Sequence, residues 1–256
     1  MRLEIIQFAP VLGDLEATLL KLEKMFFKAQ YADWVVLPEL ANSGYNFKDR
    51  EEAFSIAEST DDSRFLEFIM LQCKKYDLRV CTGFCERVGD KLYNSSVLVD
   101  AKGVLGTYRK LHLFMREKEI FEPGNLGAPL FEVDGVKIGM LICFDWMFPE
   151  IWRKLAIEGA DLIFHSANLV LPHAQNVVPT YSLVNRIYIA TANRTGAEDN
   201  LKFTGNSVVT DPGGKVLAKA SKKEEVIMVE IDPFIARNKM VTAKNHAFLD
   251  RRPEFY

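Results

Sequence analysis

The feature that most constrains the fold of this chain is the alternation of short apolar runs with helix-like patterns along its length. Residues 34–37 are a continuous apolar run of the type found in buried strands, and residues 136–144 are expected to form a second buried strand. After Asp14, a predicted N-cap, apolar residues recur from Leu15 to Ala29 at the spacing of one helix face. Strands that are apolar on both faces must be covered on both sides. The mixture of predicted hairpins and helical crossovers indicates an α/β fold with two sheets and helices outside them, and stacking of the two sheets would explain why so many strands are apolar on both faces.

The remaining predicted elements follow the same two patterns. We expect further strands at residues 3–9, 79–86, 93–99, 104–110, 162–165, 187–192, 207–209, 216–218 and 226–231. We expect further helices at residues 63–76, 149–158 and 179–186, and a short last helix after Asp232. No low-complexity linker divides residues 1–256, which predicts a single domain. Residues 238–256 form a polar C-terminal tail with little core material, and we expect this tail to pack at a subunit interface.

The composition excludes several classes of function. With 32 Lys and Arg against 35 Asp and Glu, the chain lacks the excess positive charge that nucleic-acid binding requires. No apolar run approaches the ~18 residues that a transmembrane helix needs, and Glu4 interrupts the segment where a secretory signal would be apolar. Four cysteines are too few for a disulfide framework in a chain of this length. We therefore expect a cytoplasmic protein with no nucleic-acid and no membrane partner.

Several common catalytic motifs are absent from the sequence. It contains no G-x-S-x-G motif, no phosphate-binding loop, no G-x-G-x-x-G motif and no H-E-x-x-H motif. The four histidines, His112, His165, His173 and His246, show no metal-ligand spacing. The sequence therefore indicates no metal site.

Three reactive side chains instead follow predicted strands. Cys143 stands where a strand turns into a helix, a position from which a nucleophile projects while the following backbone N–H groups face a developing oxyanion. Glu39 follows one apolar run and Lys110 ends another strand. A buried glutamate can transfer protons, and a nearby lysine can stabilise both a thiolate and an oxyanion. Taken singly, each also fits a plain alternative, a core thiol or a solvated charge at a strand end.

The three segments that contain these side chains resemble the three blocks of the nitrilase, or carbon–nitrogen hydrolase, superfamily. They read Leu-Pro-Glu-Leu (37–40), Tyr-Arg-Lys-Leu-His-Leu (108–113) and Cys-Phe-Asp-Trp-Met-Phe-Pro-Glu (143–150), in the order and at the separations of that family. Further matching stretches lie at residues 44–45, 94–95, 122–124, 185–186, 192–194, 205–207 and 211–212. The resemblance covers nearly the whole chain. It implies a four-layer αββα sandwich whose subunits form a homodimer or a higher assembly of dimers.

The resemblance also implies roles for residues at matching positions. Glu39 would be the general base, Lys110 the cation that stabilises the oxyanion, and Cys143 the nucleophile. A second glutamate that fixes the lysine follows it in the family, and both Glu117 and Glu119 fit that position. Such a site cleaves a small amide or N-carbamoyl compound through a thioester on the cysteine, with no metal and no organic cofactor.

Residues beside these blocks are candidates for the substrate pocket. They are Tyr45, Phe144, Trp146, Asn168 and His173, with the backbone N–H of Phe144 as the second oxyanion donor. The Cys-Phe-Asp sequence at 143–145 looks like the amidase and carbamoylase branches of the family. Met147 stands where the branch acting on dicarboxylate monoamides carries an arginine, which argues against an acidic substrate.

Three alternatives stay open on the sequence. A nitrilase would use the same site on a nitrile and release the acid and ammonia. A Cys–His dyad would instead pair Cys143 with His112 or His165. A catalytically silent relative would serve as a binding or scaffold protein, although the usual mark of such proteins, loss of a catalytic residue, is absent here.

Overall fold

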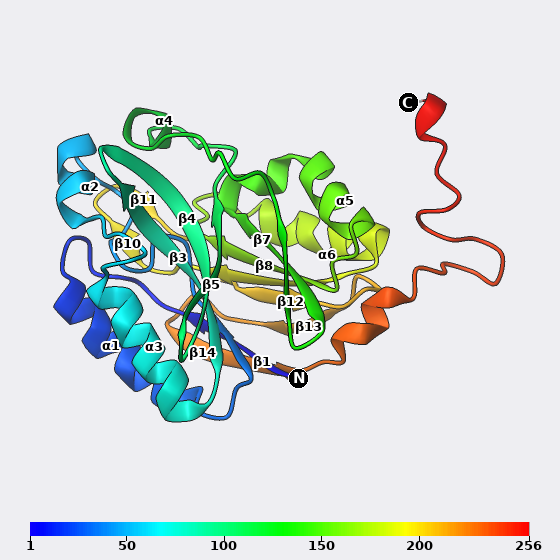
Figure 1. The fold of residues 1–256 in the computed structure, drawn as a ribbon, viewed down its shortest axis with the longest axis horizontal. Coiled ribbons are helices and arrows are strands. Elements are labelled where there is room, and N and C mark those ends of the chain that lie inside the picture. The colour runs from blue at the N-terminus through cyan, green and yellow to red at the C-terminus, as the bar shows by residue number, and fades with distance from the viewer. Residues whose placement is uncertain (256) are drawn as a thin grey trace.

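The computed structural model describes residues 1–255 and contains two six-stranded mixed sheets packed face to face (Figure 1). In spatial order, the first sheet contains β14 (Glu225–Glu230), β1 (Arg2–Gln7), β2 (Trp34–Val36), β3 (Arg79–Val88), β4 (Lys91–Asp100) and β5 (Gly103–Arg109). The second contains β13 (Val216–Lys219), β12 (Val208–Thr210), β9 (Tyr188–Asn193), β8 (Leu162–Ala167), β7 (Val136–Ile142) and β6 (Leu130–Val133). A small ribbon pairs β10 (Ala197–Glu198) with β11 (Leu201–Lys202).

Helices cover the outer face of each sheet (Figure 1). The helices are α1 (Leu15–Lys28) and α3 (Arg64–Tyr76) on the first sheet, and α5 (Pro149–Ile157) and α6 (Ala174–Asn185) on the second. Shorter elements are α2 (Arg50–Ile56), α4 (Glu117–Ile120), η1 (Cys143–Met147), η2 (Pro233–Arg237) and η3 (Pro253–Phe255). The prediction of two stacked mixed sheets between layers of helices is confirmed.

The core between the sheets explains why so many strands are apolar on both faces. Trp34 of β2 packs on Phe164 of β8, with ring centroids 5.2 Å apart, so the two sheets meet through large side chains. On the outer side of β2, Val35 is buried with Phe26 of α1 and Ile69 of α3. Each central strand is thus covered twice, as the continuous apolar runs require.

The direction of the central strands positions the functional residues. β1, β2 and β3 run parallel in the first sheet, and β7, β8 and β9 run parallel in the second. The carboxyl ends of parallel strands lie at the same edge of a sheet, which is where ligands bind in open α/β folds. The segments that follow β7 and β8 therefore lie at one edge of the second sheet. A hydrogen bond of 2.9 Å from Asn168 Nδ2 to the Glu39 carbonyl joins this edge to the segment that follows β2 in the first sheet.

Several details differ from the sequence-based expectations. The sixth helix begins at Ala174, not at Pro179, because the buried side chains of Ala174 and Val178 pack on the second sheet and outweigh the cost of an interior proline. β7 ends at Ile142, since the positive φ of Cys143 (41°) terminates the extended conformation. The short elements α2, α4, β6, β10 and β11 were not predicted, because runs of two to seven residues carry little periodicity.

The segment after Asn238 leaves the sandwich, and the chain ends well away from it in Figure 1. Phe248 lies over the Arg153 guanidinium of α5 at 5.2 Å, whereas Leu249 is 80% exposed. Within residues 1–255, no helix has both the length and the apolar character needed to cross a membrane.

Candidate active site

Glu39, Lys110 and Glu117 form a buried network of charges at the carboxyl ends of the strands. The Lys110 Nζ atom lies 2.6 Å from Glu39 Oε1 and 2.8 Å from Glu117 Oε1. All three side chains are almost completely excluded from solvent. Burial disfavours the charge on Lys110, but the Glu117 and Glu39 carboxylates outweigh this effect and raise the pKa of the ammonium well above its usual range. Lys110 therefore stays charged inside the protein.

The structure distinguishes the two candidates for the second glutamate. Glu117 begins α4 and points its carboxylate at Lys110, whereas Glu119 lies at the surface beside Arg116 with its side chain 71% exposed. Burial raises the pKa of Glu117, Lys110 lowers it, and the charge of Glu39 raises it again. Glu117, and not Glu119, is thus the residue that contacts the lysine.

Glu39 is held by the strand next to its own. The segment after β2 continues along β3 through hydrogen bonds from Leu37 N–H to the Cys81 carbonyl and from Gly83 N–H to the Pro38 carbonyl. A Cβ atom on Gly83 would lie 2.4 Å from Glu39 Cα, so only glycine allows this close approach of the two backbones. The sheet itself therefore fixes the position of the glutamate backbone.

The two oxygens of the Glu39 carboxylate have different surroundings. Oε1 accepts hydrogen bonds from Lys110 Nζ and from Asn94 Nδ2, the latter at 2.7 Å. Oε2 is buried and has no hydrogen-bond partner in residues 1–255. One oxygen is thus held in place while the other is free to take a proton. Asn94 was not assigned a role from the sequence, although it lies in one of the segments that resemble the family.

Cys143 is the first residue of η1, directly after β7, and its side chain is buried. Burial raises the pKa of the Cys143 thiol well above its usual range, and the Glu39 charge raises it further. The Lys110 ammonium and a hydrogen bond from the Asn168 backbone N–H act in the opposite direction. The resting group is therefore a protonated thiol that needs a base before it can attack.

Asp145 fixes the turn that presents Cys143. Its Oδ2 atom accepts the Ile142 N–H at 2.9 Å and the Tyr108 hydroxyl at 2.7 Å. Its backbone carbonyl accepts the Trp152 indole N–H at 3.0 Å. The left-handed conformation of Cys143 is thus braced on both sides. This support was not foreseen, because it joins residues from β5, β7 and α5.

Neither candidate histidine is directed at the Cys143 sulfur. His165 binds the Cys143 carbonyl oxygen through Nε2 at 3.0 Å and the Thr191 hydroxyl through Nδ1 at 3.1 Å. His112 binds Asp145 through Nδ1 at 2.7 Å and stacks on Phe148. These contacts favour Glu39 over a histidine as the base.

A cavity of about 190 Å³ opens beside Cys143. Its lining consists of Phe114, Cys143, Phe144, Trp146, Met147, Asn168, Leu169, Val170, Leu171 and His173. Four of the five predicted pocket residues are therefore part of this wall, which carries no carboxylate, ammonium or guanidinium group. The fifth, Tyr45, lines a neighbouring cavity of about 90 Å³ and donates its hydroxyl to Glu117 Oε1 at 2.8 Å. Within residues 1–255, no cluster of three or more His, Cys, Asp or Glu side chains could hold a metal ion.

Comparison with known proteins gives consistent matches over most or all of the chain. The family model described as carbon-nitrogen hydrolase matches residues 2–237. A protein named nitrilase from Pyrococcus abyssi is 44% identical and is aligned over 100% of this chain and 99% of its own length. A 2-oxoglutaramate amidase from Bacillus subtilis is 32% identical over 80% of each chain. The crystal structure of a carbon-nitrogen hydrolase from Helicobacter pylori superposes with a TM-score of 0.86 at 26% identity, covering 100% of this chain and 97% of the other.

Proposed function

This chain belongs to the carbon–nitrogen hydrolase family, and on that basis we propose that it hydrolyses a small amide to a carboxylic acid and ammonia. Cys143 is the nucleophile, Glu39 the general base and acid, Lys110 the cation that stabilises the oxyanion, and Glu117 the residue that fixes Lys110. One observation carries the proposal. The Lys110 Nζ atom is held between the buried carboxylates of Glu39 and Glu117, close to the buried thiol of Cys143.

The first half of the reaction forms a thioester. Glu39 Oε2 takes the thiol proton as the Cys143 sulfur attacks the amide carbon, and the carbonyl electrons move to oxygen. An ammonium has three N–H donors, and two of those on Lys110 are used by Glu39 and Glu117. The third donor and the Phe144 backbone N–H stabilise the oxyanion. Glu39 then gives the proton to the leaving nitrogen, the C–N bond breaks and ammonia departs.

The second half of the reaction releases the acid. Glu39, again a carboxylate, removes a proton from a water molecule that attacks the thioester carbon. The tetrahedral intermediate uses the same two oxyanion donors. Its collapse breaks the C–S bond, and the proton held by Glu39 returns to the sulfur. The cycle ends with the same protonated thiol with which it began.

The cavity supports a substrate with an uncharged, apolar acyl group. Trp146, Phe114 and Leu169 are among the aromatic and aliphatic side chains of its wall, and no charged group stands opposite them. A carboxylate or ammonium on the acyl chain would lose its hydration without gaining a partner. We therefore propose that small aliphatic amides are better substrates than dicarboxylate monoamides.

The test compares substrates of matched shape. Ammonia release is measured with 4-methylpentanamide and with succinamate, which carries a carboxylate in place of the isopropyl group, together with an N-carbamoyl amino acid. We expect kcat/KM for the apolar amide to exceed that for succinamate by at least ~30-fold, because an unpaired buried charge costs ~2 kcal/mol or more. Faster hydrolysis of succinamate would contradict the proposed acyl pocket, and preference for the N-carbamoyl compound would assign the carbamoylase branch.

A nitrile is the second candidate substrate, favoured by the 44% identity with the relative named nitrilase. Attack of Cys143 on a nitrile gives a thioimidate, which one water converts to a thioester with loss of ammonia and a second water hydrolyses to the acid. Including 4-methylpentanenitrile in the same panel distinguishes the two. Faster turnover of this nitrile than of the amide would assign the nitrilase activity. A folded protein that turns over no member of the panel would favour the scaffold alternative.

We further propose that the protein is a homodimer formed through α5 and α6, with residues 238–256 packing at the same interface. These two helices expose Ile157, Leu183 and Val184 on the outside of the second sheet. The tail exposes Val241 and Leu249 in turn. Apolar side chains grouped on one face are typical of subunit interfaces.

Light scattering on the wild type is expected to give twice the mass of one chain. Replacing Leu183 and Val184 together by glutamate would place unpaired charges in the interface and is expected to give a monomer. Leu20→Glu is the control, because Leu20 is 61% exposed on α1, on the opposite outer face of the sandwich. A monomeric wild type, or equal loss of the dimer in both variants, would contradict the proposed interface.

We propose a cytoplasmic location for this reaction. All four cysteines are free and buried, and the mechanism requires Cys143 as a thiol. A reducing compartment keeps such thiols from oxidation.

A further inference from the structure

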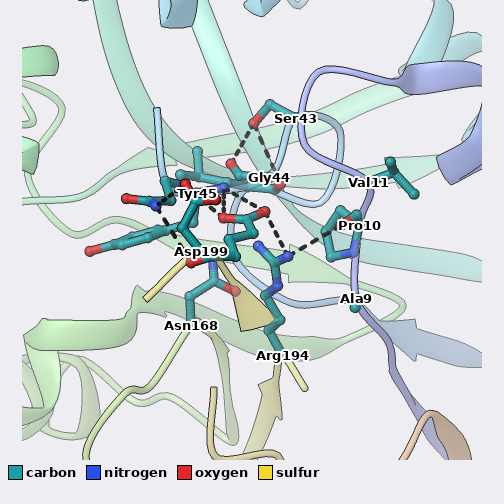
Figure 2. A network of polar contacts seen from close by, with 12 residues as sticks. Ala9, Pro10, Val11, Ser43, Gly44, Tyr45, Asn168, Arg194 and Asp199 are labelled. Atoms are coloured by element: carbon teal, nitrogen blue, oxygen red, sulfur yellow. Dashed lines mark hydrogen bonds and ion pairs between the residues drawn. The ribbon is translucent and has the colours of Figure 1, made fainter. Parts of the chain in front are cut away.

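Another buried ion pair lies close to Tyr45 and has no part in the reaction described above. Glu198, in β10, pairs with Arg194, with Glu198 Oε1 2.6 Å from Arg194 Nη2. Glu198 Oε2 accepts the backbone N–H groups of Tyr45 at 3.1 Å and Asn46 at 2.7 Å. Figure 2 shows Arg194 on one side of this network and Gly44 and Tyr45 on the other. One side chain thus binds an arginine four residues away and two adjacent backbone N–H groups more than 150 residues away.

The residues around Glu198 restrict the conformation of the turn at residues 44–46. Gly44 has φ +85°, and a Cβ atom there would lie 2.7 Å from Glu198 Oε1, so glycine is required for the carboxylate to approach. Phe203 packs against the Arg194 guanidinium at 4.3 Å and against the Tyr45 ring with centroids 5.9 Å apart. Glu198 therefore holds the backbone of Tyr45, and Phe203 packs against its ring.

The pair is poorly explained as a device for stability. Arg194 is 1% exposed, and its Nε and Nη1 atoms have no hydrogen-bond partner within residues 1–255. Burial lowers the pKa of Arg194, while the Glu198 charge opposes that shift. Burying two charges removes both from water at a large cost in desolvation, and an apolar replacement is often at least as stable. The feature that distinguishes this pair is instead the geometry that it imposes on the turn at residues 44–46.

The turn at residues 44–46 is connected to Lys110 through the side chains of Tyr45 and Glu117. The Tyr45 hydroxyl donates to Glu117 Oε1, the same oxygen that accepts from Lys110 Nζ. We infer that Glu198 is a positioning residue of this reaction, which holds the 44–46 turn so that the Tyr45 hydroxyl keeps Glu117, and through it Lys110, in place. This inference rests on the proposed function, and Arg194 serves it by holding the Glu198 carboxylate.

The test is a double-mutant cycle between Glu198→Gln and Tyr45→Phe, read as kcat for the preferred amide. Glutamine has nearly the same shape, but its amide has a single acceptor oxygen for the three donors that the carboxylate binds. We expect each single variant to lower kcat ~10-fold or more, with KM changed less than ~3-fold, because displacement of a catalytic group by about 1 Å is that costly. In the Tyr45→Phe background, Glu198→Gln should lower kcat by less than ~3-fold, because the hydrogen bond from Tyr45 to Glu117, through which Glu198 acts on Lys110, is already absent.

A pH profile provides a readout that loss of stability alone would not change. Burial raises the pKa of Glu117, and hydrogen bonds from Lys110 and Tyr45 lower it. Removing the Tyr45 hydroxyl, or releasing it through Glu198→Gln, removes a donor to the ionised form and so raises that pKa. The acidic limb of kcat/KM is therefore expected to move to higher pH in both variants.

The matched control is Asp161→Asn, at the opposite end of the second sheet from Cys143. Asp161 is also a buried carboxylate that accepts a backbone N–H, from Lys137 at 3.0 Å, and pairs with an arginine, Arg237 at 2.9 Å. We expect this variant to lose comparable stability while kcat stays within ~2-fold of the wild type.

Three outcomes would overturn the inference. The effects of Glu198→Gln and Tyr45→Phe could multiply, which would make the two residues independent. Glu198→Gln could leave kcat unchanged, or Asp161→Asn could lower it equally. If the wild type itself released no ammonia from any substrate, the proposed function would fail and this inference with it. The assay of the wild type alone identifies this failure of the proposed function, before any variant is compared.

Discussion

Cys143→Ala is expected to reduce turnover of the preferred amide by at least ~10⁴-fold, since loss of the nucleophile in other covalent hydrolases costs up to ~10⁶-fold. No other thiol can replace it, because Cys73, Cys81 and Cys85 are buried among apolar side chains away from the cavity. Ammonia release measures the loss. Mass spectrometry of the intact protein after mixing with substrate should show an acyl adduct on the wild type and none on the variant.

Cys81→Ala is the matched control. Cys81 lies in the core between the sheets, and burial raises its pKa to about 12, so its thiol is inert. This variant should lose about 1 kcal/mol of stability and keep kcat within ~2-fold of the wild type. If Cys143→Ala retained more than ~1% of wild-type turnover while folded, the thioester mechanism would be wrong.

Glu39→Gln is expected to lower kcat ~10³-fold, within the range of ~10²–10⁴ that general acid–base catalysis provides. The same carboxylate takes the thiol proton, protonates the leaving nitrogen and activates water. Both halves of the reaction should therefore slow together, with no initial burst of ammonia in a rapid-mixing experiment. The substitution is nearly isosteric, and an amide oxygen can still accept from Lys110. Loss of activity would then reflect proton transfer more than displacement of the lysine.

The pH dependence of the residual activity provides a second check on Glu39. Burial is the main reason why the pKa of Cys143 is high, and the negative charge of Glu39 raises it further. Removing that charge lowers the thiol pKa. The thiolate should then form without a base as pH rises, and the residual activity of Glu39→Gln should increase with pH to a greater extent than that of the wild type.

Glu119→Gln is the control for this experiment, since Glu119 lies near the site in sequence but points to solvent. Its kcat should stay within ~2-fold of the wild type. A Glu39→Gln enzyme with an initial burst of ammonia would show that thioester formation does not require this carboxylate, and Glu39 would then serve the second half only.

Some residues of the candidate site could be proposed from the sequence, and others could not. Glu39, Lys110 and Cys143 could be proposed from position, because each follows a strand and strand ends meet at one edge of a sheet. The choice between Glu117 and Glu119 could not be made from the sequence. Both residues lie in α4, and which one faces Lys110 depends on how that short helix packs. Tyr45 was expected as a pocket wall, yet its hydroxyl binds Glu117.

Glu198, which we propose as a positioning residue, illustrates why such a residue cannot be predicted from the sequence. It lies in a two-residue strand with no recognisable pattern, and its partners at Tyr45 and Asn46 are more than 150 residues away. Asn94, Tyr108 and Asp145 also act through contacts between different strands. No local property of the chain encodes such contacts.

The amino-acid order of this chain encodes the type of each long element, because side-chain periodicity and capping are local and require only neighbouring residues. Apolar residues on both faces of a strand also require that both faces be covered, since exposed apolar surface is costly. The order of the strands and the packing between the two sheets determine which charges meet. Contacts such as Lys110 with Glu39, or Glu198 with the turn at residues 44–46, arise only when the assembled sheets exclude water and force buried polar groups to find partners.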